Sequence, residues 1–299
     1  MSKVVLRASP GPDWATRQPR FRAPPGSVDC HAHLFGPIAR YPYASDRMYS
    51  PVESTAEDYA RMLNAIGVDR AVVVQGSAQG TDNRILLDAI AAQNRRWRGI
   101  AVVDANVTDS HLAALAGGGI VGMRMSNTLV PGTPLARLSE FATRVAPLGW
   151  HLQLHFRSSD ELVEHADAIA LCRVPVLVDH LASATGAEGV ETPGFRGLLN
   201  LMRECDHVWT KIAAFYRRSV DAPRYDDIRT LAQAVVAARP DRVVWGTNWP
   251  HPVYEGRAPN DGDLLDLFAD WFPAPGTQRS ILVENPERLF GFSPYASDA

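Results

Sequence analysis

The chain has 299 residues, a length that suits two average domains or one large barrel, and its 46% hydrophobic and 21% charged content is ordinary for a globular protein with a substantial core. The net charge of −3 gives no reason to expect a nucleic acid partner, and no apolar segment approaches the roughly 18 residues needed to cross a bilayer. The three cysteines lack C-x-x-C spacing, so we expect no disulfide framework and a cytoplasmic location.

The first 25 residues carry scattered Arg and Pro without an apolar signal core, and we expect an irregular N-terminal extension there. From residue 26 onward, short apolar runs alternate with segments of helical period. The eight runs are Val28–Phe35, Ala71–Gln75, Gly99–Val103, Ile120–Met125, Trp150–Phe156, Pro175–His180, Val208–Ala213 and Val243–Trp245.

Helix-start signals stand between these runs. Thr55 is followed three residues later by Asp58, and Thr133-Pro134 is typical of an N-cap and first helical residue. Strands that alternate with helices imply a parallel sheet, because parallel neighbours need crossover connections. Eight such units favour an α/β fold, a (β/α)8 barrel formed by residues 26–299 as a single domain. A doubly wound open sheet is the alternative.

Histidines stand at the ends of several predicted strands. His31 and His33 are two residues apart, so on a strand both rings point into one space. His155, His180 and Asn248 end later strands, at the barrel face where active sites lie. Imidazole is a common metal ligand and a general acid or base near neutral pH. The plainer interpretation is hydrogen-bonded core histidine.

Other polar residues near strand ends have plainer interpretations. Asp179 has the opposite parity to His180, so we expect it to face the helices if His180 faces the lumen. Lys211 and Arg218 are expected on a solvated face or in a crossover ion pair. His251, just beyond Pro250, stays open between a structural and a functional role.

Several motifs together resemble the amidohydrolase superfamily, and most closely its branch of 2-pyrone-4,6-dicarboxylate lactonase and sulfomuconolactone hydrolases. The resemblance runs from about Pro24 to Phe292. The motifs are Val28-Asp29-Cys30-His31-Ala32-His33, Leu154-His155, Val178-Asp179-His180, Trp245-Gly246-Thr247-Asn248-Trp249-Pro250-His251 and Asn285-Pro286-Glu287-Arg288-Leu289-Phe290.

The resemblance implies a distorted (β/α)8 TIM barrel. In metal-dependent members, the positions of His31, His33 and His155 hold a divalent ion, usually zinc, together with an Asp at the position of Asn248. The position of His180 polarises the substrate or relays a proton. The pyrone dicarboxylate lactonase is instead understood to work without metal, and it has an aromatic residue where this chain has His155.

The resemblance also implies an anion-binding pocket. Arg124 and Arg217 match two arginines that hold the dianionic substrate of the lactonase, and Tyr49 and Ser77 match further substrate contacts. A third lactonase arginine falls near Val130. Planar guanidinium groups suit such substituents because they bind carboxylates bidentately. The expected partner is therefore a small anionic cyclic carboxylate or sulfonate.

Asn248 departs from the motif, since an amide accepts hydrogen bonds but not a catalytic proton. It is either an engineered substitution that silences the base or a natural variant in which His180 or a metal-bound hydroxide moves the proton. We predict a hydrolase that opens a small anionic lactone in aromatic-compound degradation. The alternatives are a nonoxidative decarboxylase of the same superfamily and a catalytically weak binding protein.

Overall fold

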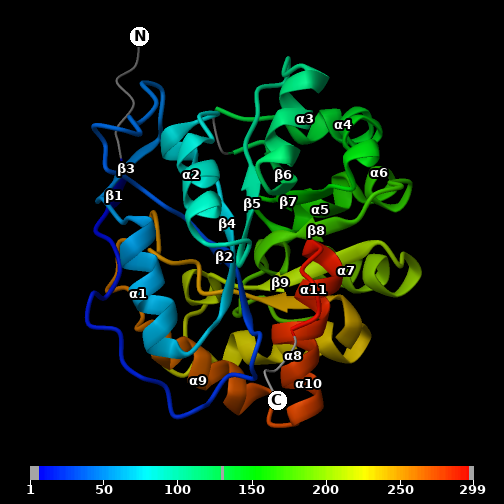
Figure 1. Cartoon of the computed structure of the whole chain (residues 1–299). Coiled ribbons are helices and arrows are strands. Elements are labelled where there is room, and N and C mark those ends of the chain that lie inside the picture. Colours follow the sequence, from blue (N-terminus) through cyan, green and yellow to red (C-terminus); the bar gives the residue numbers. More distant parts are fainter. Residues whose placement is uncertain (1–6, 129–130, 296–299) are drawn as a thin grey trace.

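The computed structural model describes residues 7–128 and 131–295, and Val130 therefore lies outside the described residues. Its centre is a sheet of eight parallel strands in the order β2-β4-β5-β6-β7-β8-β9-β10, with helices around the outside (Figure 1). The strands are β2 (Val28–Ala32), β4 (Arg70–Val74), β5 (Trp97–Ala101), β6 (Ile120–Ser126), β7 (His151–His155), β8 (Val176–Val178), β9 (Val208–Ile212) and β10 (Val243–Trp245). Each of the eight apolar runs therefore overlaps one strand of the barrel, although β4 and β5 begin one and two residues before their runs and β6 ends one residue after its run.

The barrel closes through the segment that follows β10. The backbone N–H of Asn248 donates to His31 O at 2.8 Å, and that of His33 donates to Trp249 O at 2.7 Å. An isolated bridge between Ala32 and Trp249 replaces a regular ladder at this seam. The fold is thus a distorted (β/α)8 barrel, as predicted, and its seam runs beside the first histidine pair.

The helices follow the strands along the chain. They are α1 (Ala56–Ile66), α2 (Arg84–Ala92), α3 (Asp109–Gly117), α4 (Leu138–Val145), α5 (Ser159–Glu164), α6 (Ala166–Ala170), α7 (Pro193–Glu204), α8 (Asp226–Ala238), α9 (Asp261–Trp271), α10 (Pro275–Arg279) and α11 (Asn285–Phe290). The helix predicted after Thr55 is confirmed: Thr55 and Asp58 form a capping box. The start predicted at Thr133-Pro134 is one residue early: Pro134 is the cap residue, and a 3-10 turn from Leu135 to Arg137 leads directly into α4. The Thr133 hydroxyl does not cap this turn but donates to Val103 O.

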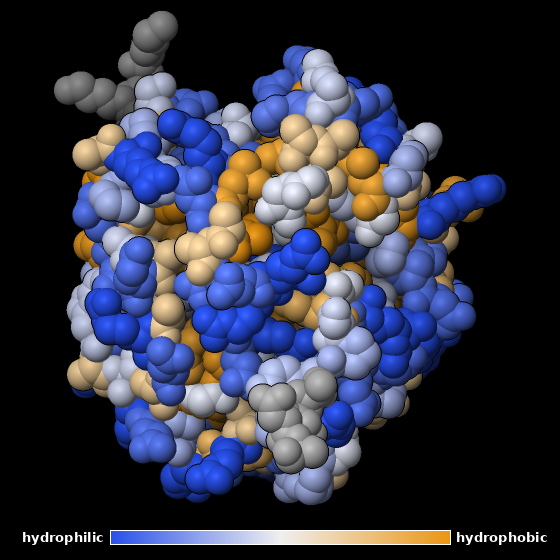
Figure 2. Space-filling model, in the orientation of Figure 1, coloured by the Kyte–Doolittle hydropathy of each residue, from blue (hydrophilic) through white to orange (hydrophobic). Residues whose placement is uncertain are grey.

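Two kinds of core result from strand alternation. Alternate residues of the strands fill the barrel lumen, among them Val72, Leu177 and Trp209. The opposite faces pack against the helices, where Tyr59 and Phe141 are fully buried. The face shown in Figure 2 is largely hydrophilic with smaller apolar groups, and no helix in the described part of the chain has the length and apolar character to cross a membrane.

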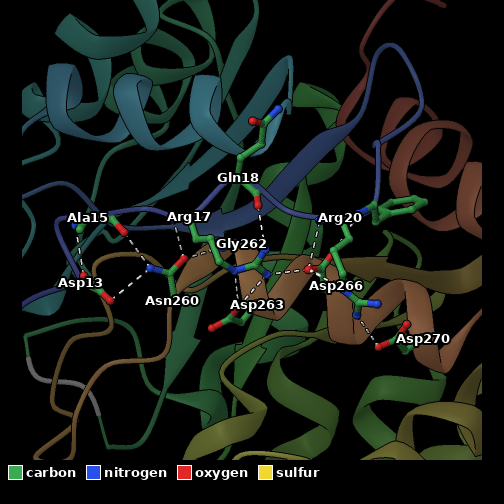
Figure 3. A network of polar contacts seen from close by, with 11 residues as sticks. Asp13, Ala15, Arg17, Gln18, Arg20, Asn260, Gly262, Asp263, Asp266 and Asp270 are labelled. Atoms are coloured by element: carbon green, nitrogen blue, oxygen red, sulfur yellow. Dashed lines mark hydrogen bonds and ion pairs between the residues drawn. The ribbon is translucent and has the colours of Figure 1, made fainter.

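The N-terminal segment is partly ordered into a strand. β1 (Arg7–Ser9) pairs in parallel with β3 (Tyr49–Pro51). Residues 13–21 then run along α9, where Asp266 accepts the backbone N–H of Phe21 at 2.8 Å (Figure 3). The segment expected to be irregular therefore contains one short strand and joins β3 to α9.

Candidate active site

A pocket of about 350 Å³ opens at the carboxyl ends of the strands. Its lining includes His33, Tyr49, Ser77, Arg124, His155, His180, Arg217 and Asn248. These are all the predicted site residues except His31, which lies directly behind His33, with 3.2 Å between their Nε2 atoms. The structure therefore brings together, at one barrel face, residues that are up to 217 positions apart in the chain.

A β-bulge in β2 directs the side chains of His31 and His33 into the barrel lumen. Pairing with β4 shifts register between Asp29 and Ala32, which is a β-bulge. Cys30 belongs to the lumen cluster and His31 also meets lumen side chains, so strict alternation is lost here. Asp29 anchors the bulge from outside, because one of its oxygens accepts the backbone N–H groups of His31 and Thr247 at 3.1 and 3.0 Å.

A buried ammonium group lies beneath the histidines. Lys211 Nζ is 2.8 Å from His31 Nδ1, 3.2 Å from Gln153 Oε1 and 3.3 Å from Asp179 Oδ1, and the Lys211 and Asp179 side chains have no exposed area. Gln153 also donates to the second oxygen of Asp179 at 2.9 Å. Of the two positions expected for Lys211, the solvated face is wrong, because the residue shares its parity with Trp209 and faces the lumen. The ion pair is found, with Asp179 as the partner.

These contacts assign the protons of the histidine pair. Lys211 donates to His31 Nδ1, so His31 carries its proton on Nε2 and donates it to His33 Nε2. His33 then donates through Nδ1 to Val74 O at 2.8 Å. Both acceptor nitrogens of the pair are therefore occupied by donors from within the protein.

The orientation expected for Asp179 is also wrong. Leu177 on β8 faces the lumen, so the alternation of the strand places Asp179 there too. His180 enters the same space through a left-handed turn, since the φ values from His180 to Ser183 lie between 50° and 58°. Such a run of non-glycine residues stores strain, and strain of this kind gathers at functional sites.

His180 and His155 lie on the far side of His31. The His180 ring is 4.7 Å from that of His31 and 6.0 Å from that of His155, centre to centre. His180 Nδ1 donates to Ala213 O at 3.0 Å, so its Nε2 is an acceptor, and it receives no hydrogen bond from the residues that the structure describes. Among the described residues, His31, Asp179 and His180 form the group of potential metal ligands whose nitrogen and oxygen atoms lie within 4.8 Å of one another. This group differs from the predicted ligands His31, His33 and His155.

Burial keeps these imidazoles neutral. It lowers the pKa of His180 well below the usual value, and the nearby charges of Lys211 and Arg217 lower it further. Burial followed by the neighbouring His180 lowers the pKa of His155 to about 3. At neutral pH the rings therefore act as hydrogen-bond partners and proton acceptors rather than as cations.

Guanidinium groups surround the rest of the pocket. Arg124 is buried on β6, where Nη2 donates to Gln75 O at 2.7 Å and Nε has no partner within the described residues. Arg217 comes from the turn Phe215–Arg217 and is exposed. Arg7, Arg157 and Arg218 also line the pocket and were not predicted there. Burial and the adjacent Arg217 lower the pKa of Arg218, so an anion between the two would relieve repulsion.

Asn248 stands where the seam of the barrel meets the pocket. It has a left-handed backbone (φ 64°), which Asn adopts more readily than most residues. Its side-chain Nδ2 donates to the Tyr216 hydroxyl at 2.8 Å, and Tyr216 contacts His251 in turn. His251 is therefore buried and does not line the pocket; it contacts Asn248 of the pocket wall through Tyr216.

The barrel and its rim of strand-end histidines define the class of protein: a (β/α)8 enzyme with its site at the carboxyl ends of the strands. The chain belongs to the amidohydrolase family, whose family model matches residues 28–292. It is accordingly a hydrolytic enzyme.

Three related proteins are similar over nearly the full chain. A 4-sulfomuconolactone hydrolase from Hydrogenophaga intermedia is 36% identical, with 97% of this chain and 98% of that protein covered. A 2-pyrone-4,6-dicarboxylate hydrolase from Comamonas testosteroni is also 36% identical, with 93% and 95% covered. An apo crystal structure from Agrobacterium tumefaciens superposes with a TM-score of 0.83 at 29% identity, covering 93% of this chain and 100% of that one.

Proposed function

We propose that this enzyme hydrolyses a small anionic lactone of the pyrone dicarboxylate or sulfomuconolactone type, in the breakdown of aromatic compounds. The observation that carries the proposal is the buried Arg124, whose Nε has no hydrogen-bond partner among the described residues and which lines a pocket together with His33 and His180. A buried guanidinium without a counter-ion is costly unless a ligand supplies the anion. The names of the two curated relatives supply the substrate class.

In the proposed reaction, Arg124 and Arg217 bind the acid groups of the substrate, with Tyr49 and Ser77 as further contacts. Water attacks the ring carbonyl. His180 Nε2, free because Nδ1 is committed to Ala213 O, accepts a proton from the water. Asn248 orients the water. The positive charge of Arg124 stabilises the oxyanion that develops on the carbonyl oxygen.

The residues present do not fit the predicted zinc site. His31 Nδ1 already accepts from Lys211, and His33 Nε2 already accepts from His31. A divalent ion on His31 would also lie beside a buried ammonium group. These contacts support a reaction carried by the chain's own side chains. We expect lactone hydrolysis to survive dialysis against a chelator, and activity that is lost and then restored by Zn²⁺ would contradict this.

Product analysis tests the proposed activity. The purified enzyme is incubated with 2-pyrone-4,6-dicarboxylate and with 4-sulfomuconolactone, and ring opening is followed by mass spectrometry. Hydrolysis adds one water to the substrate, whereas decarboxylation releases carbon dioxide, and a binding protein alters neither. We expect the hydrated, ring-opened acid from at least one substrate. Release of carbon dioxide would favour the decarboxylase alternative.

A further inference from the structure

Four buried polar side chains form a line that leads away from the pocket. Asn248 Nδ2 donates to the Tyr216 hydroxyl at 2.8 Å, and that hydroxyl lies 2.7 Å from His251 Nδ1. His251 Nε2 lies 3.3 Å from Asp261 Oδ1, and the side chains of both residues are fully buried. Asn248 lines the pocket, whereas Tyr216, His251 and Asp261 lie behind it.

The direction of the protons in the line follows from both ends, the acid beside His251 and the amide that donates to Tyr216. Neither oxygen of Asp261 receives a hydrogen bond within the described residues, and the nearby His251 Nε2 is not aligned for one at 3.3 Å. A buried carboxylate at that distance favours the tautomer with the proton on Nε2. His251 Nδ1 is then an acceptor.

The other hydrogen-bond directions follow from the number of protons that Tyr216 and Asn248 can donate. Burial raises the pKa of the Tyr216 phenol, so the hydroxyl keeps its single proton and donates it to His251 Nδ1. Tyr216 must therefore accept from its other neighbour, which is the NH₂ of Asn248. The Asn248 oxygen is turned away from Tyr216, and within the described residues no hydrogen bond ends on it.

We infer that Tyr216, His251 and Asp261 are positioning residues that fix the Asn248 amide with its oxygen toward the pocket, as the acceptor that orients the attacking water. The inference rests on the proposed lactone hydrolysis. Aligned hydrogen bonds polarise one another, so the line also strengthens the Asn248 oxygen as an acceptor. It explains how an amide contributes at this position although it takes up no proton.

The N-terminal segment contacts Asn260, the residue before Asp261, and so holds the far end of the line in place; Figure 3 shows the contacts of Asn260. Asp261 is the first residue of α9, and the preceding Asn260 caps that helix. Asn260 Oδ1 accepts from Arg17 N at 2.9 Å, while its Nδ2 donates to Asp13 Oδ2 at 3.1 Å and to Ala15 O at 3.0 Å. The segment that crosses α9 therefore fixes the position of Asp261.

The test compares Tyr216→Phe with Tyr225→Phe, a buried tyrosine near the same Phe215 ring. The first readout is hydrogen exchange of the Asn248 side-chain NH₂ by NMR, assigned from its absence in Asn248→Asp. We expect exchange about 10- to 100-fold faster in Tyr216→Phe and unchanged in Tyr225→Phe, because one hydrogen bond is lost. Unchanged exchange in Tyr216→Phe would overturn the inference. This readout needs no substrate, so failure of the proposed function leaves it intact.

The second readout is steady-state kinetics on the lactone. We expect kcat of Tyr216→Phe to fall about 10- to 100-fold with KM nearly unchanged, since the substrate contacts remain. Faster amide exchange without a loss in kcat would show that the line is structural, and would overturn its role in positioning the water. Asp261→Asn gives a second test if Tyr216→Phe does not fold: it should lower kcat in the same direction, and an unaltered kcat would count against the inference.

Discussion

Lys211 determines which nitrogen of each ring in the His31–His33 pair carries the proton. Its ammonium group occupies the acceptor nitrogen of His31 and neutralises Asp179 in the lumen. Neither charge has access to water, so each depends on the other. Removing one member of such a pair leaves a buried charge uncompensated.

Lys211→Met should therefore lower the free energy of unfolding by about 3–5 kcal/mol, measured by urea denaturation. Adding Asp179→Asn to this variant should recover much of the loss, because the remaining buried charge is removed. Arg196→Met is the control, since Arg196 pairs with Glu191 at 3.6 Å on the surface and should cost less than about 1 kcal/mol. Equal losses from both single variants would contradict the buried-pair account.

Asn248 offers a test of the base position itself. Asn248→Asp should raise kcat by roughly 10²–10⁴, the usual value of a positioned general base, because a carboxylate takes a proton from water. In the parent enzyme His180 alone accepts the proton, so His180 substitution should abolish its turnover. A variant no faster than the parent would mean that a carboxylate at position 248 adds nothing to that base.

At the scale of elements, the segment over α9 links the N-terminus to the pocket. Asp266 of α9 accepts from Arg17 Nη2 at 2.5 Å, from Phe21 N at 2.8 Å and from Arg20 N at 3.2 Å. β1 continues this segment to β3, which carries Tyr49. Figure 3 shows that the Asp266 carboxylate lies at the centre of these contacts.

Asp266→Ala should therefore free the segment. We expect a loss of about 1.5–3 kcal/mol in stability, since charged hydrogen bonds are removed. Amide exchange of residues 13–21, measured by mass spectrometry, should become faster. Asp263→Ala is the matched control, because its side chain is 57% exposed and pairs with the same Arg17. Similar exchange in both variants would show that Asp266 does not anchor the segment.

The elements also show where sequence patterns succeed and fail. Strand alternation correctly placed His31 and His33 in one space, but the β2 bulge that does so is set by Asp29 contacts from distant segments. Alternation on β8 and β9 could have located Asp179 and Lys211 in the lumen, as partners of Leu177 and Trp209. The left-handed turn at His180 carries no glycine signal. The line behind Asn248 joins distant segments, so no local pattern reveals it.

At the scale of the whole molecule, buried histidines make stability depend on pH. Burial lowers the pKa of His151 and of His155 from 6.5 to about 3. Between these values the unfolded chain binds protons that the folded chain does not, so stability falls as the pH is lowered. Asp29 has the opposite effect on stability, because burial raises its pKa from 3.8 to about 6. Its protonated form stabilises the folded chain at low pH, and this stabilisation is lost as the pH rises through that range.

Burial also lowers the pKa values of His31, His33 and His180, so the effect of the histidines on the pH dependence of stability should exceed that of Asp29. We expect the free energy of unfolding to decrease steadily from pH 6.5 toward pH 4, by up to about 1.4 kcal/mol per pH unit for each histidine. Denaturant melts at each pH measure this. His151→Leu should reduce the slope, and stability that rises on acidification would contradict the account.

The central claim is that the pocket opens anionic lactone rings, and the ratio of kcat/KM for an anionic lactone to that for its uncharged analogue tests it most directly. We predict a ratio of at least about 100 for the parent enzyme, because loss of charged hydrogen bonds to Arg124 and Arg217 costs about 1.5–3 kcal/mol each. Arg124→Met should reduce the ratio about tenfold or more, while Arg196→Met leaves it unchanged. A ratio near one in the parent enzyme, or no turnover of any lactone, would contradict the account.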